Sequence, residues 1–179
     1  MQTTSIENYP YKYESWLKLS NGTDVFLRPV LPTDSHLLIN LFNKMSSRSL
    51  WFRFLRRIDS LSENMVYRFT HVNYNSEFAL VAIIKEDEKE TIIAVGRYGY
   101  EPDEDITELA VAVRDDWQQL GIGKSLLIKV VAIAKENGIS RFTGMMTCDN
   151  NIIRNILSEL NYDVQYSSKS GFFQVEIVT

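Results

Sequence analysis

The sequence contains very little cysteine and histidine. Of its 179 residues one is a cysteine, Cys148, and two are histidines, His36 and His71. One cysteine excludes a disulfide within the chain. A structural zinc site uses about four ligands, mostly cysteine and histidine, so these three residues do not supply one. We therefore expect neither an internal disulfide nor a metal site.

Long apolar runs and an excess of positive charge are also missing. No stretch approaches the roughly 18 apolar residues of a membrane-spanning helix, and the N-terminus has no basic region followed by an apolar core. A net charge of −4 argues against a nucleic-acid surface and for cationic partners. With 45% hydrophobic and 23% charged residues, the composition is that of an ordinary soluble globular protein. We expect a cytoplasmic protein that binds neither nucleic acid nor membrane.

The length is that of one folded domain, which we expect to span residues 1–179. Residues 1–13 are polar and tyrosine-rich without a usable period, so they are expected to form a loose N-terminal arm. Two strand-like runs, 14–20 and 23–30, flank Asn21-Gly22, a dipeptide that tolerates the positive φ angles of a tight hairpin. A β-hairpin is therefore predicted to open the fold.

Helical and strand-like patterns then alternate along the chain. Apolar residues at helical spacing predict helices over residues 32–44, 46–57, 119–137 and 151–160, and one more after the capping-box sequence Ser60-Leu61-Ser62-Glu63. Strands are predicted over residues 78–84, 91–100, 106–113, 141–148, 162–166 and 172–178. This order predicts an α+β fold with a mixed, mostly antiparallel, twisted sheet of about seven strands flanked by helices.

The segment from Ser46 to Arg57 mixes aromatic residues with four arginines. One interpretation is a nucleic-acid patch with stacking aromatics. The interpretation that we favour is a short amphipathic helix with a solvated basic face, because the net charge of the whole chain is negative.

The segment from Glu108 to Ser125 joins a strand, a glycine turn and a helix start. An alternating apolar run, Leu109 to Val113, precedes the motif Gln118-x-x-Gly121-x-Gly123 and a helical pattern. Glycine lacks a Cβ, so backbone amides here can approach a phosphate, and a helix N-terminus carries partial positive charge. The spacing matches neither the Walker loop nor the dinucleotide fingerprint. It is compatible with a pyrophosphate site and also with a simple turn of the chain.

This arrangement resembles the GNAT superfamily of acyl-CoA-dependent N-acyltransferases. The resemblance rests on the glycine motif, the V-A-V strand before it, the long helix and strand after it, and Asp149-Asn150 before the last helix. From Tyr9 onward the chain is also similar to the acetyltransferase domain of bacterial protein lysine acetyltransferases. The sequences that carry this similarity are N-G-T-D-V-F-L-R-P-V-L-P-T-D, R-F, N-Y-N-S-E-F-A-L-V-A, A-V-G-R and E-L-A-V-A-V-R-D-D-W.

That domain is often fused to an acyl-CoA-synthetase-like region or to a nucleotide-sensing domain. We expect such regulation to be absent here or supplied by another chain. The resemblance implies a three-layer α/β, GNAT-like architecture whose sheet splays between the family's fourth and fifth strands, which correspond to residues 106–113 and 141–148 here. It also implies acetyl-CoA as co-substrate.

In such a fold, the strand backbone would pair with the pantetheine arm, the amides of the turn would hold the pyrophosphate, and one asparagine side chain would contact the cofactor near the last helix. The implied cofactor-binding residues are Val111, Ala112, Val113, Gln118, Gln119, Leu120, Gly121, Ile122, Gly123, Lys124, Ser125 and Asn150.

The resemblance also implies a catalytic base, Glu108. A lysine ammonium has a pKa near 10.4 and must lose a proton before it can attack, so a carboxylate beside it assists at neutral pH. A solvent-facing strand residue is the alternative role of Glu108. A backbone N–H near Val111 would stabilise the oxyanion. Glu77 would line the acceptor pocket, or support a neighbouring arginine such as Arg97.

The chain departs from the family pattern at the leaving-group acid. Many of these enzymes carry a tyrosine in the last helix where this chain has Leu157. Tyr162 and Tyr166 are weak substitutes, and a thiolate can also leave without an acid. Cys148 is expected to be a buried strand residue without an acyl-carrying role. The acidic loop of residues 101–105 would either guide a cationic partner or form an ordinary hairpin tip.

The function predicted from these features is acetyl transfer from acetyl-CoA to protein lysine side chains, by direct attack in a ternary complex. Two alternatives remain open at this point. One is acetylation of a small amine such as a polyamine or an amino sugar, and the other is a non-catalytic acyl-CoA sensor. The chain is expected to be a monomer or a homodimer.

Overall fold

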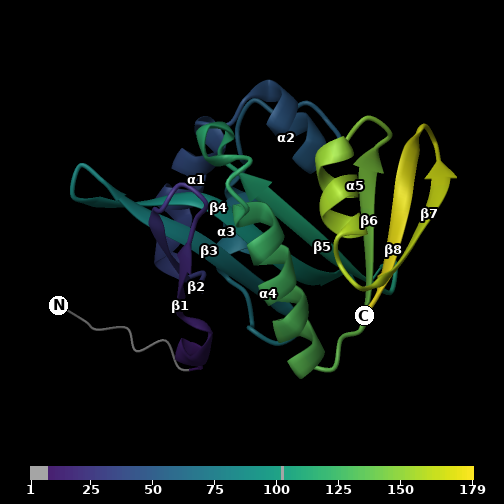
Figure 1. The fold of residues 1–179 in the computed structure, drawn as a ribbon, viewed down its shortest axis with the longest axis horizontal. Coiled ribbons are helices and arrows are strands. Elements are labelled where there is room, and N and C mark those ends of the chain that lie inside the picture. The colour runs from purple at the N-terminus through teal and green to yellow at the C-terminus, as the bar shows by residue number, and fades with distance from the viewer. Residues whose placement is uncertain (1–7, 102) are drawn as a thin grey trace.

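A computed structural model describes residues 8–101 and 103–179. Its framework is one sheet of eight strands in the order β1-β2-β3-β4-β5-β6-β8-β7 (Figure 1). The strands are β1 (Ser15–Lys18), β2 (Asp24–Pro29), β3 (Glu77–Glu86), β4 (Lys89–Glu101), β5 (Ile106–Val113), β6 (Arg141–Thr147), β7 (Asp163–Lys169) and β8 (Phe172–Val178). The α-helices are α1 (Ser35–Asn43), α2 (Ser47–Phe54), α3 (Glu63–Thr70), α4 (Ile122–Glu136) and α5 (Asn151–Ser158).

Apolar residues of the central strands are buried on both faces of the sheet. On β3, Phe78 and Leu80 pack with α4 and α5 on one face, while Ala79 and Val81 pack with α1 and α3 on the other. Side chains alternate along a strand, so a strand covered on both sides carries a continuous apolar run. Helices therefore cover both faces, and the molecule has three layers.

The sheet changes character at β5. Strands β2 to β5 are paired antiparallel. The chain then crosses over through α4 and returns in β6, which is parallel to β5. The register of these two strands contains one pair, Glu108 with Thr143. Beyond it β5 and β6 diverge, and the gap between their C-terminal ends is visible in Figure 1.

The expected fold class and the predicted splay agree with this structure, and the sheet has eight strands rather than about seven. The opening hairpin is also confirmed: Gly22 has a φ of 86° and Asn21 accepts a hydrogen bond from the Thr23 amide at 3.0 Å. Both hairpin strands join the main sheet, as do both C-terminal strands.

Two helix starts differ from the prediction. The capping side chain of α3 is Ser62, which accepts a hydrogen bond from the Met65 amide at 3.3 Å, so the predicted capping box at Ser60 is wrong. Helix α4 begins at Ile122 instead of near Gln119. The φ of Gln119 is 61°, and a left-handed residue cannot continue a right-handed helix.

Part of the expected loose arm packs against the sheet. Tyr9 is 8% exposed, and its hydroxyl donates a hydrogen bond to Glu14 at 3.0 Å. Tyr13 packs edge-on against Phe78 and donates a hydrogen bond to Glu136 at the end of α4. Residues 8–13 therefore belong to the packed structure, and residues 1–7 lie outside the described residues.

Within residues 8–101 and 103–179, no helix combines the length and the apolar character that crossing a membrane requires.

Close packing of α4 on β4 makes Gly96 a sensitive position. A Cβ added at Gly96 would lie 3.1 Å from Cβ of Leu126 and 3.4 Å from a methyl group of Val130. Gly96→Ala is expected to lower the free energy of unfolding by about 1–3 kcal/mol, measured by urea titration. Gly144→Ala is the control, because its nearest neighbour would be a carbonyl oxygen at 3.7 Å. An equal loss in both variants would contradict this account.

Candidate functional site

A cavity of about 90 Å³ lies where β5 and β6 diverge. Its walls come from both strands, from α2 on one face of the sheet, and from α4 and α5 on the other. The lining residues include Phe52, Arg53, Leu109, Ala110, Val111, Leu127, Gly144, Met145, Met146, Asn150, Ile153 and Leu157. The cavity therefore passes between the strands and joins the two faces of the sheet.

The outer edge of β5 offers backbone groups to this cavity. The N–H and C=O of a strand residue point to one side, and successive residues alternate. The Arg114 amide donates to the Ile93 carbonyl of β4 at 2.9 Å, so the even-numbered residues of β5 face β4. Val111 and Val113 consequently face β6, beyond the one registered pair. The Val113 carbonyl accepts a hydrogen bond from the Gln118 side chain at 3.0 Å.

Arg114 anchors the segment that follows β5. Its side chain is 4% exposed and forms ion pairs with Glu86 and Asp116. Hydrogen bonds from Arg114, with a smaller contribution from Lys44, lower the pKa of Glu86 to about 2, although partial burial acts in the opposite direction. These charges hold the start of the loop that leads to α4.

Asp115 and Gln118 connect this loop to α2. Asp115 accepts hydrogen bonds from the amide and hydroxyl of Ser46 at 2.8 and 2.7 Å and from the hydroxyl of Ser49 at 2.8 Å. Gln118 donates to the Ser49 hydroxyl at 3.2 Å and also bonds the end of β5. The side chain of Gln118, predicted to contact a cofactor, is thus a structural link between α2 and β5.

The N-terminus of α4 presents free amides after the loop that follows β5. Gly121 precedes the helix with a φ of 86°, and no side chain caps the helix. The first amides of a helix have no partner inside it, so those of Ile122, Gly123 and Lys124 are available to a ligand. The Ser125 amide already donates to the Gly121 carbonyl at 3.0 Å.

Two other predicted cofactor residues have partners within the protein. The Lys124 side chain forms an exposed ion pair with Glu159. Asn150 is 5% exposed, lines the cavity and caps α5 by accepting a hydrogen bond from the Ile153 amide at 3.3 Å. A capping role explains this asparagine without a ligand, and the residue is also part of the cavity wall.

Glu108 lies at the narrow end of the splay. It is opposite Thr143 on β6 and Gly99 on β4, and Gly99 is in turn opposite Glu77 on β3. Directly opposed residues share a face of the sheet, so both glutamates lie on the face that α1, α2 and α3 cover. The Glu108 side chain is exposed and accepts no hydrogen bond from any described residue.

Arg97 lies between these two glutamates. It is two residues before Gly99 on the same face, and its Nη2 is 3.2 Å from the place where a Cβ of Gly99 would be. The guanidinium of Arg97 stacks on the ring of Phe69 at 4.7 Å. Burial lowers the pKa of Arg97, and the negative charges of Glu77 and Glu108 partly offset this effect.

Several residues of the cavity wall were not predicted from the sequence. The prediction of a solvated basic face on the helix of residues 46–57 is wrong for Arg53, which is half-buried and lies within 5.8 Å of the Phe69 ring. Phe52, Met145 and Met146 also line the cavity. The mixture of arginines and aromatic residues distinguishes this helix in the sequence, but no local pattern predicts which of these side chains face the sheet.

No leaving-group acid is evident at the cavity. Leu157 lines it at the position where the family pattern has tyrosine. Tyr162 packs into the core, and Tyr166 lies on the edge strand β7 against the ring of Phe173. Cys148 is exposed just after β6, so the prediction of a buried cysteine is wrong.

Two residues of the acidic loop are paired with other side chains of the protein. In the acidic loop, Glu101 forms an ion pair with Arg68 at 2.6 Å and Asp105 accepts a hydrogen bond from Tyr100. In the part of the chain that the structure describes, no three His, Cys, Asp or Glu side chains are grouped as metal ligands.

Comparison with known proteins agrees with this geometry. Residues 47–155 match the model of the family described as "Acetyltransferase (GNAT) family". The chain is 26% identical over 150 residues to an acetyltransferase of Pseudomonas aeruginosa, with 83% of this chain and 81% of that protein covered. It is 30% identical over 145 residues to acetyltransferase Pat of Mycolicibacterium smegmatis, with 80% of this chain and 43% of that protein covered.

A solved structure is similar over nearly the whole chain. The crystal structure of the GNAT domain of S. lividans PAT has a TM-score of 0.87 at 27% identity, and the match covers 96% of this chain and 100% of that one. These matches confirm the family resemblance. The chain spans less than half the length of the Mycolicibacterium smegmatis protein that it matches.

The Glu86 ion pairs make stability depend on pH. Because the pKa of Glu86 falls from 4.5 to about 2 on folding, its charge stabilises the fold above about pH 4.5, and this contribution is lost as the pH falls toward 2. Since 32% of the side chain is exposed, we expect Glu86→Gln to cost about 1–2 kcal/mol at pH 7 and less than half of that at pH 3. Urea titrations at both pH values measure the difference.

Asp59→Asn is the matched control, because its ion pair with Arg57 is almost fully exposed. Its cost is expected to stay within about 0.5 kcal/mol at either pH. A cost of Glu86→Gln that did not change with pH would contradict the assignment.

Proposed function

The chain belongs to the GNAT family of acetyltransferases, and on this premise we propose that it acetylates lysine side chains of proteins with Glu108 as the general base. Acetyltransferases of this family use acetyl-CoA and an amine acceptor. In the proposed reaction both are bound together, and the acetyl group passes directly from one to the other.

One observation carries the proposal: the free edge of β5 runs from the Glu108 carboxylate to the open amides of α4. Along this line lie a proton acceptor, unpaired strand groups at Val111 and a helix N-terminus. These three features suit an amine, a pantetheine amide and a pyrophosphate in turn. A simple chain turn would not require all three to lie in sequence along one strand and the helix that follows it.

The residues of β5, of the loop before α4 and of the start of α5 suit acetyl-CoA. The backbone of Val111 and Val113 would bond the amides of the pantetheine arm in the manner of an added strand. The amides of Gln119 through Lys124 would hold the pyrophosphate, and Asn150 would contact the cofactor from the start of α5. When bound, acetyl-CoA supplies an activated thioester.

The chemistry assigned to the chain is proton removal and charge stabilisation. Glu108 takes a proton from the lysine ammonium, directly or through a water, so that the amine nitrogen can attack the thioester carbon. A backbone N–H near Val111 faces the cavity and would stabilise the oxyanion that forms. The carbon–sulfur bond then breaks, and coenzyme A leaves as a thiolate. No acid is assigned to this last step.

The acceptor class rests on similarity. The sequence resembles bacterial protein lysine acetyltransferases from Tyr9 onward, and the chain matches the whole GNAT domain of S. lividans PAT. Glu77 and Arg97, on the same face as Glu108, are proposed to line the acceptor side. Two alternatives are a preference for a small amine acceptor and coenzyme A binding without turnover. Thiol release with a panel of acceptors, together with coenzyme A binding, detects either one.

The loop proposal is tested with two glycines in matched conformations. Gly121 and Gly138 have φ angles of 86° and 80°, and neither has an atom within 4 Å of an added Cβ. Alanine is strained there, so Gly121→Ala lets the loop relax and binding must restore it. We expect Gly121→Ala to weaken coenzyme A binding about tenfold by calorimetry, since the strain is about 1.4 kcal/mol.

Gly138→Ala introduces the same kind of strain, so it should lower the melting temperature about as much as Gly121→Ala does. It should leave the affinity for coenzyme A unchanged. Equal affinities of both variants for coenzyme A would remove the loop from the cofactor site.

The base is tested with Glu108→Gln, which keeps the size and removes the proton acceptor. Thiol release from acetyl-CoA with a panel of proteins and amines is expected to fall about 10²–10⁴-fold, with coenzyme A affinity unchanged. Glu104→Gln, in the exposed loop between β4 and β5, is the control and should keep full activity. Native turnover by Glu108→Gln with every acceptor would show that another group is the base. Coenzyme A binding without any thiol release would favour a sensor.

A further inference from the structure

Two arginines on the acceptor side of the cavity have no partner for their hydrogen-bond donors. A guanidinium carries five N–H donors. Arg53 of α2 and Arg97 of β4 make no ion pair or side-chain hydrogen bond with any residue that the structure describes, and Nη1 of Arg97 is fully buried without a partner. The buried Nη1 of Arg97 is therefore a costly donor, and the Arg53 guanidinium near it is half-buried and also unpaired, so the two groups together offer positive charge to an acidic ligand.

The two guanidinium groups share one aromatic ring. Arg97 lies 4.7 Å and Arg53 lies 5.8 Å from the centre of the Phe69 ring, and Arg53 also lies 4.9 Å from the ring of Phe54. Burial, together with the charge of Arg97, lowers the pKa of Arg53 to about 10, and the charge of Glu108 acts in the opposite direction. Both groups stay positive at neutral pH, so two like charges are held together.

The space around the arginines decides which of them a ligand can reach. The small cavity that Arg53 and Arg97 line together is about 10 Å³, which is room for about one water. Arg53 also lines the larger cavity between β5 and β6. A negatively charged group therefore reaches Arg53 from the larger cavity. Arg97 does not contact this group, but its charge adds to the positive potential at Arg53.

We propose that Arg53, reinforced by Arg97, binds a carboxylate of the acceptor, so that the enzyme prefers amines with a carboxylate close by. The inference rests on the proposed function, because it places the acceptor amine at Glu108. The carboxylate can accept two charge-assisted hydrogen bonds from the guanidinium. It comes either from an acidic residue beside the target lysine of a protein or from the α-carboxylate of a free amino acid.

The experiment compares acceptors that differ only in this carboxylate. One pair is a lysine peptide with glutamate or glutamine next to the lysine, and the other is free lysine or lysine amide. We expect the glutamate peptide to be used about tenfold better in kcat/KM, measured by thiol release. A preference of the same size confined to free lysine over its amide would assign the carboxylate to amino acids.

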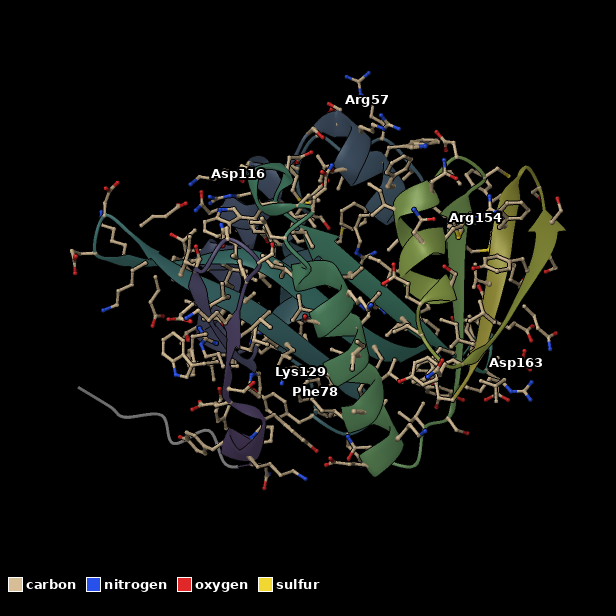
Figure 2. All side chains as sticks on the ribbon, viewed as in Figure 1. Arg57, Phe78, Asp116, Lys129, Arg154 and Asp163 are labelled. Carbon is tan, nitrogen blue, oxygen red and sulfur yellow. The ribbon has the colours of Figure 1, made fainter. Side chains whose placement is uncertain are left out.

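The variants are Arg53→Met and Arg57→Met. Methionine keeps the apolar packing of the arginine stem and removes its charge. Arg57 is the control because its side chain is 89% exposed and points away from the molecule at the end of α2 (Figure 2). The preference is expected to vanish in Arg53→Met and to remain in Arg57→Met. Arg53→Lys, which keeps the charge without the planar fork, is expected to restore part of it.

Calorimetry of the same acceptors in the presence of coenzyme A separates this inference from the proposed function. A carboxylate preference in binding that is lost in Arg53→Met, without turnover of any acceptor, supports the carboxylate site and contradicts the proposed reaction. Turnover without a carboxylate preference overturns the inference and leaves the reaction standing. A preference that Arg53→Met retains also overturns it.

Discussion

The site depends on the way in which β5 and β6 separate beyond the Glu108–Thr143 pair. If β5 and β6 stayed in register, the backbone N–H and C=O groups along the whole outer edge of β5 would be hydrogen-bonded to β6. Because they diverge, the backbone at Val111 and Val113 faces a cavity. A free strand edge is a liability in most proteins. Here α4 and α5 cover the gap on one face and α2 reaches it from the other, which confines the free edge to one cavity (Figure 1).

Helix α2 links the two sides of this cavity. Near its N-terminus, Ser46 and Ser49 bond to Asp115 and Gln118 in the loop that leads to α4. Near its C-terminus, Arg53 lines the cavity between β5 and β6. Hydrogen bonds to a carboxylate are stronger than those between neutral groups. The loop proposed to hold the cofactor and the helix proposed to contact the acceptor are therefore positioned relative to each other by direct bonds.

The sequence-based predictions failed where one local sequence pattern is compatible with two different structures. Three residues, 119–121, were wrongly assigned to the start of α4, because nothing in the apolar pattern indicates that Gln119 adopts a left-handed conformation. The serine cap of α3 was shifted by two residues, because both serines fit a start signal. Arg53 was assigned to a solvated face, although amphipathic periodicity cannot tell a solvent-facing arginine from one that stacks on an aromatic ring of another helix.

The sequence by itself determined the order of the elements, the fold class, the family resemblance and the segment from Glu108 to Ser125, because hydrophobic periodicity, turn glycines and motifs are local along the chain. Only the tertiary structure decided which distant residues meet. In the folded chain Arg53 and Arg97 lie beside the ring of Phe69, and the side chain of Gln118 links α2 to β5. Such contacts depend on how helices pack across a twisted sheet, and packing is a property of the folded chain that no short stretch of sequence contains.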